Sequence, residues 1–173
     1  MNLFIDTEFS ELTRDAQLIS FAAVAEDGQA FYCELAPLPT ATSAFVREVV
    51  LPLLEGGPAV CRREDFAGRL AAWLGRFDNP MLLCDSDWDI YVLRHAVSGE
   101  RHRRPGPLTL SAPVGRCEAM LLMLRPLSGD DLALYERTVA ACLVRDPRPH
   151  HALADARAIR EGYLAVRAAS AAE

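Results

Sequence analysis

The sequence predicts an α/β fold in which a mixed five-stranded sheet is packed against helices. Three apolar runs of strand length open the chain, at residues 2–5, 18–25 and 31–35, and a tight turn separates the last two. A run of four apolar residues at 81–84 is typical of a buried parallel strand, and residues 108–110 are the fifth strand. Strands that come first and then alternate with helices indicate a mixed sheet covered by helices.

Helices are predicted where apolar residues recur at spacings of three and four. The first begins near residue 45 after a capping residue, Thr42 or Ser43, and Asn79-Pro80 ends the second. The predicted helical ranges are about 45–53, 63–77, 87–97, 118–124, 130–144 and 152–169.

The 173 residues are expected to form one domain, residues 1–173, whose core needs no disulfide or structural metal. The longest stretch without a charged residue, 35–46, is too short and too interrupted by proline to cross a bilayer, and the first residues lack the basic region of a secretory signal. The five cysteines are widely spaced, without a CxxC motif. We therefore expect a cytoplasmic protein with reduced cysteines and no membrane partner.

The formal charge of -6 argues against a protein that coats nucleic acid through a broad basic face. It is compatible with an enzyme that acts on nucleic acid through metal-binding carboxylates. All 18 basic residues are arginine, and their one run, Arg101-His102-Arg103-Arg104, is either a solvated loop after a helix, the commoner case, or a phosphate contact. The sequence has no glycine-rich phosphate loop, which disfavours a nucleotide kinase or GTPase.

Acidic residues follow two of the predicted strands. Asp6 and Glu8 end the first strand and, because side chains alternate along an extended chain, both face the same side. Two carboxylates within an apolar strand need a counter-ion, so they indicate either a cation site or a chance surface pattern. Asp85, Asp87 and Asp89 follow the buried fourth strand. Acids in the first turn of a helix commonly cap free N–H groups, which suits Asp87, whereas Asp89 is as much a candidate metal ligand as a cap.

A third candidate group lies near the C-terminus, where a turn leads into the last predicted helix. His150 is expected on the turn and Asp155 on the inner face of the helix, so that both reach the same site. His95 and His102 have no such partner in the sequence and are expected to be ordinary surface or core residues.

These motifs together resemble those of the DEDDh family of 3'-5' exonucleases. Asp6-x-Glu8, Asp85-x-x-Trp88-Asp89 and His150-x-x-x-x-Asp155 occur in the family's order and span most of the chain. The Asp-Thr-Glu-Phe start and the His-His-Ala-Leu-Ala-Asp-Ala run are most similar to a small bacterial, mycobacterial-type exoribonuclease branch, with oligoribonuclease and ribonuclease T as more distant relatives. The resemblance implies a ribonuclease-H-like fold with helices on both faces of the five-stranded sheet.

The resemblance also implies a site for two Mg²⁺ or Mn²⁺ ions and a histidine general base, His150. The implied metal ligands are Asp6, Glu8, Asp89 and Asp155. Many relatives have Asn and Phe where this chain has Asp85 and Trp88, which leaves Asp85 and Asp87 as alternatives, although the spacing from Trp88 favours Asp89. Carboxylates are hard oxygen ligands that suit these ions, and two such ions stabilise the attacking and leaving oxygens of phosphodiester hydrolysis.

The implied substrate is the 3' end of a single-stranded nucleic acid, with RNA or short oligoribonucleotides favoured over DNA. Phe9 and Trp88 are candidates for stacking on bases, and core packing is the alternative for both. A homodimer is implied as well, with the last helix or segment 118–124 as its surface, unless these segments pack within the chain. The remaining interpretations are a DNA exonuclease, a non-catalytic binding module on the same fold, and a metal-independent interaction protein.

Overall fold

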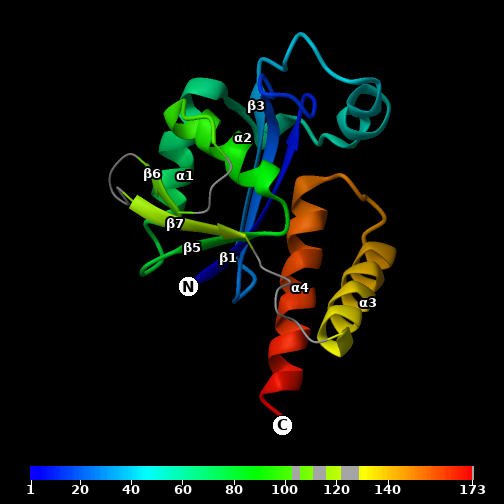
Figure 1. The fold of residues 1–173 in the computed structure, drawn as a ribbon. Helices are drawn as coiled ribbons and strands as arrows, with labels where there is room; N and C mark the ends of the chain where they lie inside the picture. The colour runs from blue at the N-terminus through cyan, green and yellow to red at the C-terminus, as the bar shows by residue number, and fades with distance from the viewer. Residues whose placement is uncertain (103–105, 111–115, 122–128, 173) are drawn as a thin grey trace.

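The computed structural model describes residues 1–102, 106–110, 116–121 and 129–172, which form one mixed sheet with helices on both faces (Figure 1). This confirms the predicted α/β class, and all five predicted strands belong to the sheet. Two further strands, β4 and β7, extend it. The strands are β1 (Asn2–Phe9), β2 (Leu18–Ala25), β3 (Ala30–Ala36), β4 (Val60–Arg62), β5 (Met81–Cys84), β6 (Gly106–Thr109) and β7 (Arg116–Leu121).

Strand β1 lies at the centre of the sheet, whose strand order is β4-β3-β2-β1-β5-β7-β6. It pairs antiparallel with β2 on one side and parallel with β5 on the other. Strands β2 and β3 continue as an antiparallel meander, while β5 pairs parallel with β7. The C-terminal ends of β1 and β5 therefore meet at one edge of the sheet.

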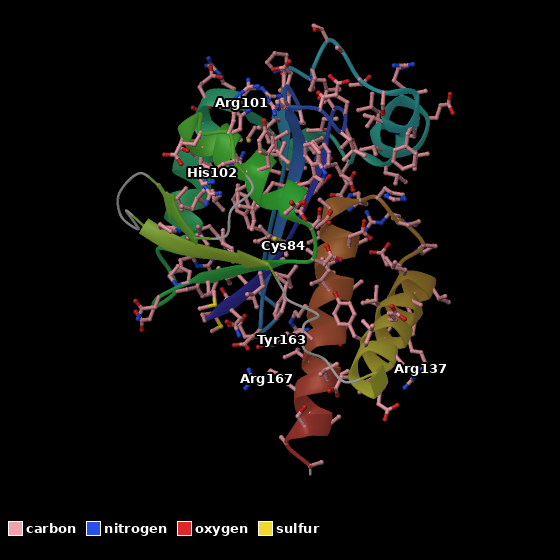
Figure 2. The ribbon with its side chains drawn as sticks, viewed as in Figure 1. Cys84, Arg101, His102, Arg137, Tyr163 and Arg167 are labelled. Atoms are coloured by element: carbon pink, nitrogen blue, oxygen red, sulfur yellow. The ribbon has the colours of Figure 1, made fainter. Side chains whose placement is uncertain are left out.

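Alternation along β1 divides the core between the two faces of the sheet. Leu3 and Ile5 pack with the apolar sides of α1 (Phe66–Leu74) and α2 (Asp87–Ser98). Phe4 points the other way and packs on Tyr163 of α4 (Ala152–Ser170), with ring centroids 4.9 Å apart. Figure 2 shows Tyr163 on α4. Strand β2 is buried along its whole length because helices or loops cover both of its faces.

Helix α3 (Gly129–Arg145) lies alongside α4 in Figure 1 and packs on it. Helix α4, one of the two surfaces considered for a homodimer, is thus packed within the chain on both the sheet and α3. No helix among the described residues is long and apolar enough to cross a lipid bilayer.

Short helical turns replace a regular α-helix after β3. They are η1 (Val46–Val50), η2 (Leu51–Leu53), η3 (Gly57–Ala59) and η4 (Arg63–Asp65). Of the two expected capping residues, Ser43 makes the bond: the Val46 N–H donates to its Oγ over 3.2 Å.

Two predicted helices are wrong in part. Residues 116–121 form β7, because their backbone pairs with both β5 and β6, and this long-range pairing outweighs the local apolar pattern that predicted a helix at 118–124. Residues 122–124 lie outside the described part of the chain. The helix predicted at 63–77 begins as the turn η4 and ends at Leu74, where the Gly75 N–H donates to the carbonyl of Ala71.

The packing of α3 on α4 depends on Gly162, which leaves room for the ring of Tyr135. A Cβ at Gly162 would lie 2.6 Å from Cδ2 of Tyr135 and 3.0 Å from Cγ2 of Val139. Because Tyr135 is buried, its ring has little freedom to move away. We expect Gly162→Ala to lower the free energy of unfolding by about 1–3 kcal/mol, as measured by urea denaturation.

Gly68→Ala is the matched control, because a Cβ at Gly68 in α1 meets nothing within 4 Å. This change is expected to be neutral or to stabilise the fold by up to about 1 kcal/mol. Equal effects of the two substitutions would contradict the close approach of α3 and α4.

Candidate metal centre

Acidic side chains from three segments meet where β1 and β5 end. They form two groups, in each of which the potential ligand atoms lie within 4.8 Å of one another. One group is Asp6, Asp85 and Asp89, and the other is Glu8, His150 and Asp155. The structure therefore brings together all five residues that the sequence motifs single out, together with Asp85, one of the two alternatives to Asp89.

The parallel pairing of β1 with β5 explains the first group. Phe4 is paired with Leu83, so two residues further on Asp6 is level with Asp85. Ser86 then caps α2 by accepting the Trp88 N–H through its Oγ over 3.2 Å. One turn of this helix is enough to bring Asp89 back over the strand ends.

Asp89 is held in a single orientation by Thr7, which lies between Asp6 and Glu8 on β1. The backbone N–H and the hydroxyl of Thr7 both donate to Oδ1 of Asp89, over 3.1 and 2.6 Å. Asp89 is 2% exposed, and its Oδ2 has no hydrogen-bond partner among the described residues. A buried carboxylate oxygen without a donor is the arrangement expected of a metal ligand.

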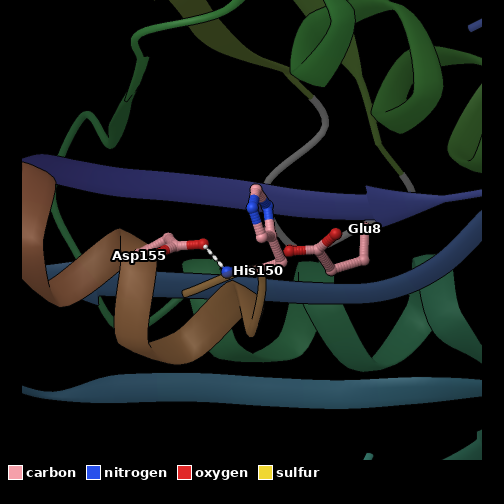
Figure 3. Close-up of side chains that lie close together, drawn as sticks. All are labelled: Glu8, His150 and Asp155. Carbon is pink, nitrogen blue, oxygen red and sulfur yellow. Dashed lines mark hydrogen bonds between the residues drawn. The ribbon is translucent and has the colours of Figure 1, made fainter. Parts of the chain in front are cut away.

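The second group depends on the turn before α4. His150 has a backbone φ of +67°, a region that is uncommon for residues other than glycine but enriched in histidine. Its N–H donates to Oδ2 of Asp155 over 2.8 Å, which holds the turn closed (Figure 3). Figure 3 also shows the His150 imidazole beside the carboxylate of Glu8. The ring is exposed, and the edge of Phe45 contacts it at a centroid distance of 4.9 Å.

The neighbouring histidine, His151, anchors this turn in the interior. It is 2% exposed and stacks on Tyr32 of β3, with ring centroids 4.8 Å apart. Its Nε2 lies 3.4 Å from Oε1 of Glu55 and 3.4 Å from Nη1 of Arg148. The two histidines of the motif thus differ in role, because one is buried as a structural anchor and the other faces the cleft.

Burial and mutual repulsion raise the pKa values of the clustered carboxyl groups. The pKa of Glu8 is raised to about 8, first by burial and then by the charges of Asp155 and Asp89. Burial raises the pKa of Asp89 to about 7, although the bonds from Thr7 lower it. Burial also raises the pKa of Asp155 to about 6. The pKa of Asp6 is raised well above its usual range by burial, by Asp89 and by Glu8.

The donor set fits divalent cations such as Mg²⁺ or Mn²⁺. It consists of carboxylate oxygens and one imidazole, and the hard oxygen donors are those that these ions prefer. Burial and mutual repulsion disfavour the ionised form of these carboxyl groups and so raise their pKa values. A cation at this position would favour the ionised form instead.

A cleft of about 670 Å³ gives access to these residues. Its walls include apolar side chains, of which Leu12 and Phe45 are 69% and 49% exposed. Phe9 also lines the cleft, whereas Trp88 stacks on Phe9 at a centroid distance of 5.8 Å and packs against the core. Of the two aromatic residues considered for base stacking, Phe9 is therefore the one in contact with the cleft.

Sequence reasoning did not single out Thr7, Leu12 or Phe45. Thr7 could have been found from its position between two acids, where its side chain must point to the opposite face of β1. Leu12 and Phe45 carry no such signal, because loop geometry alone brings them to the cleft. Asp87, which lies between Asp85 and Asp89, belongs to neither group of potential ligands among the described residues.

Comparison of the sequence with protein-family models and with curated proteins finds no match in either set. The functional conclusions below therefore depend on the geometry of the site and on the motifs.

Without metal ions, the stability of the fold is expected to fall as the pH rises through the pKa values of this cluster. A carboxyl group with a higher pKa in the folded than in the unfolded chain stabilises the fold while it is protonated only there. This contribution is lost progressively from about pH 4, where the unfolded carboxyl groups ionise, up to about pH 6 to 8, where the folded ones do. Asp89→Asn removes one charge and keeps an oxygen that can accept the Thr7 bonds. In EDTA at pH 8 we expect this variant to exceed the wild type in free energy of unfolding by roughly 1–3 kcal/mol, with the difference shrinking below pH 7 and disappearing toward pH 4.

Mn²⁺ added at pH 8 is expected to raise the Tm of the wild type and to have much less effect on Asp89→Asn. Asp78→Asn, at an exposed acid before β5, serves as the control and should follow the wild type in both measurements. A wild type whose stability in EDTA is the same at pH 5 and pH 8, and which does not respond to Mn²⁺, would rule out the metal centre.

Asp85 is expected to contribute to metal binding and Asp87 is not, because only Asp85 lies within reach of both Asp6 and Asp89. Calorimetric titration with Mn²⁺ should show an affinity about 10-fold weaker for Asp85→Asn. Asp87→Asn, the same change two residues away, should leave the affinity within a factor of two or so of the wild type. Equal losses for the two variants would mean that the general negative charge, and not direct ligation, sets the affinity.

Proposed function

We propose that this chain is a divalent-metal-dependent 3'-5' exonuclease that hydrolyses the terminal phosphodiester bond of single-stranded nucleic acid, with RNA or short oligoribonucleotides as its main substrate. The observation that carries the proposal is the convergence of four carboxylates and one exposed histidine, from three separate segments, on a single cleft. The 3' to 5' direction rests on the resemblance of the motifs to the DEDDh family.

The four carboxylates are proposed to hold two Mg²⁺ or Mn²⁺ ions, with Asp85 as an additional ligand. When bound, such ions activate water as a nucleophile and stabilise the charge on the attacking and leaving oxygens of a phosphodiester. Contacts within the chain hold the proposed ligands in position. Thr7 fixes the orientation of Asp89, and β1 holds Asp6 and Glu8 on one side of the sheet.

His150 is proposed to act as the general base. Its imidazole is exposed at the cleft and lies within 4.8 Å of the oxygens of Glu8 and Asp155. An imidazole near two carboxylates is suited to accept a proton from the attacking water and to be stabilised once it is charged. Asp155 positions it by accepting the backbone N–H, so that the turn, and not only the ring, is held toward the acids.

The cleft walls support a single-stranded substrate. An acidic site repels phosphates unless cations are present, and aromatic or apolar surfaces next to it can hold bases by stacking. Phe9, Leu12 and Phe45 supply such surfaces beside the carboxylates. A base pair would have to open before its 3' nucleotide could use them.

The proposal is tested by incubating 5'-labelled single-stranded RNA and DNA oligonucleotides with the protein in Mn²⁺, Mg²⁺ or EDTA. We expect a ladder that shortens from the 3' end in the presence of metal, faster with RNA, and no cleavage in EDTA. Asp6→Ala should abolish cleavage, and His150→Ala should lower kcat by about 10²- to 10⁴-fold, the usual contribution of a general base.

Asp78→Ala is the control, since Asp78 is exposed and does not line the cleft. This variant should cleave at the rate of the wild type. Metal-dependent shortening of DNA alone would replace RNA by DNA in the proposal. If neither strand is cleaved under any condition, a binding module on the same fold becomes the better account.

A homodimer remains part of the proposal on the strength of the motif resemblance alone. Sedimentation equilibrium of the purified chain measures it directly.

A further inference from the structure

A second hollow, of about 400 Å³, shares a loop with the cleft of the candidate metal centre. The loop between β1 and β2, residues 10–17, contributes to both, because Glu11 and Leu12 line the cleft while Asp15 and Gln17 line the hollow. Its lining also includes three basic side chains: Arg63 of η4, His95 of α2, and Arg101, which follows α2. We call it the arginine hollow. Figure 2 shows Arg101 beyond the C-terminal end of α2, on the opposite side of the molecule from α3.

The arginine hollow differs in charge from the rest of the protein. Two guanidinium groups face one carboxylate, that of Asp15, in a chain with a formal charge of -6. Burial lowers the pKa of His95, and the charges of Arg101 and Arg63 lower it further, so both guanidinium groups act on the ring. An anion in the hollow would face all three basic groups.

Both arginines are held in place by backbone carbonyl groups and keep donors to spare. Nη1 of Arg63 donates to the carbonyl of Leu18 over 3.0 Å, and its Nη2 to that of Pro37 over 3.2 Å. Arg101 uses Nη1 alone, for the carbonyl of Arg14 at 2.6 Å and for Asp15 at 2.7 Å. A guanidinium has five N–H groups. Those on Nε and Nη2 of Arg101 have no partner among the described residues, so they can donate to an anion.

The ion pair between Arg101 and Asp15 does not close the hollow. The Asp15 side chain is 86% exposed and that of Arg101 is 42% exposed. Surface pairs of this kind contribute about 0–1 kcal/mol, so a phosphate can share or replace Asp15 as the partner of Arg101 at little cost.

A continuous set of contacts connects the arginine hollow with the metal centre. Phe9 of the cleft stacks on Trp88, and Trp88 contacts Tyr91 at a centroid distance of 5.5 Å. The Tyr91 hydroxyl donates to the carbonyl of Arg14 over 2.7 Å, and this carbonyl is the one that Arg101 also binds. The two sites are thus fixed relative to each other by α2 and by one loop.

Helix α2 carries residues of both sites, and the length of helix between these residues is comparable to a few nucleotides. Asp89 and His95 are six residues apart on α2, which corresponds to about 9 Å along the helix axis. Stacked nucleotides in one strand rise by about 3.4 Å each, so roughly three nucleotides span this distance.

We infer that the arginine hollow binds a backbone phosphate of the substrate strand, a few nucleotides to the 5' side of the bond that is cleaved. This inference rests on the proposed function and adds to it a second contact, which favours substrates long enough to reach both sites. A dinucleotide occupies the metal centre alone. An oligonucleotide of eight residues engages Arg101 as well.

The test measures binding of 5'-labelled RNA of two and of eight nucleotides by fluorescence anisotropy, over a series of salt concentrations. It uses His150→Ala in Mn²⁺, so that cleavage of the strand is slow compared with the measurement. Adding Arg101→Ala should weaken binding of the eight-nucleotide RNA several-fold and lower the slope of log affinity against log salt by about 0.7, the value for one phosphate contact in a single strand. Binding of the dinucleotide should not change. Arg101→Lys keeps the charge and should retain most of the slope.

Arg137→Ala, at an exposed arginine of α3 far from Arg101 in Figure 2, is the matched control and should change neither affinity nor slope. If Arg101→Ala weakens both RNAs equally, or neither, the inference is overturned while metal-dependent cleavage of the dinucleotide keeps the proposed function intact. If no RNA binds the metal-loaded protein, both fail. If inorganic phosphate raises the Tm of the wild type but not of Arg101→Ala, without any effect of RNA length, the hollow takes a free anion and the assignment to the substrate strand is wrong.

Discussion

Burial of several carboxyl groups side by side in one cleft is the constraint on which the rest of this structure depends. Asp6, Glu8, Asp89 and Asp155 are held together although burial and neighbouring charges raise the pKa of each. The backbone offsets part of this cost. Asp89 lies in the first turn of α2 and Asp155 in the first turn of α4, where the helix dipole and free N–H groups favour negative charge. Cations would offset the remainder, which links the shape of the fold to its proposed chemistry.

Rigid and accessible parts of the site are separated. The carboxylates lie on a central strand and at the starts of two helices, and buried contacts hold them: Thr7 on Asp89, and His151 stacked on Tyr32 beneath the turn. His150 is exposed on that turn, where a substrate can meet it. This division suits a reaction in which ions need a fixed set of ligands while the strand enters and leaves. The loop between β1 and β2 contributes residues to both the cleft and the arginine hollow, so it is a segment that the two share.

Local sequence patterns predicted most of the elements but not all of their boundaries. The five expected strands are present because each is an apolar run that is buried in a sheet whichever strands pair with it. The helix expected at 118–124 failed, because its apolar residues fit a strand equally well and the decision came from the backbone groups of β5 and β6 on either side. The choice between Thr42 and Ser43 as a cap was likewise settled by the position of the Val46 N–H.

By itself, the sequence determined which chemical groups the chain carries. It also determined the relative positions of side chains that are close together in the sequence. Two-residue alternation places Asp6 and Glu8 on one side of β1, and five residues of turn and helix place His150 beside Asp155. Only the tertiary structure decided that Asp85 and Asp89, but not Asp87, lie close to Asp6, and that an oxygen of Asp89 is buried without a donor among the described residues. The physical reason is that these contacts join residues about eighty positions apart. The order and register of strands set such contacts, and both depend on the packing of the whole sheet.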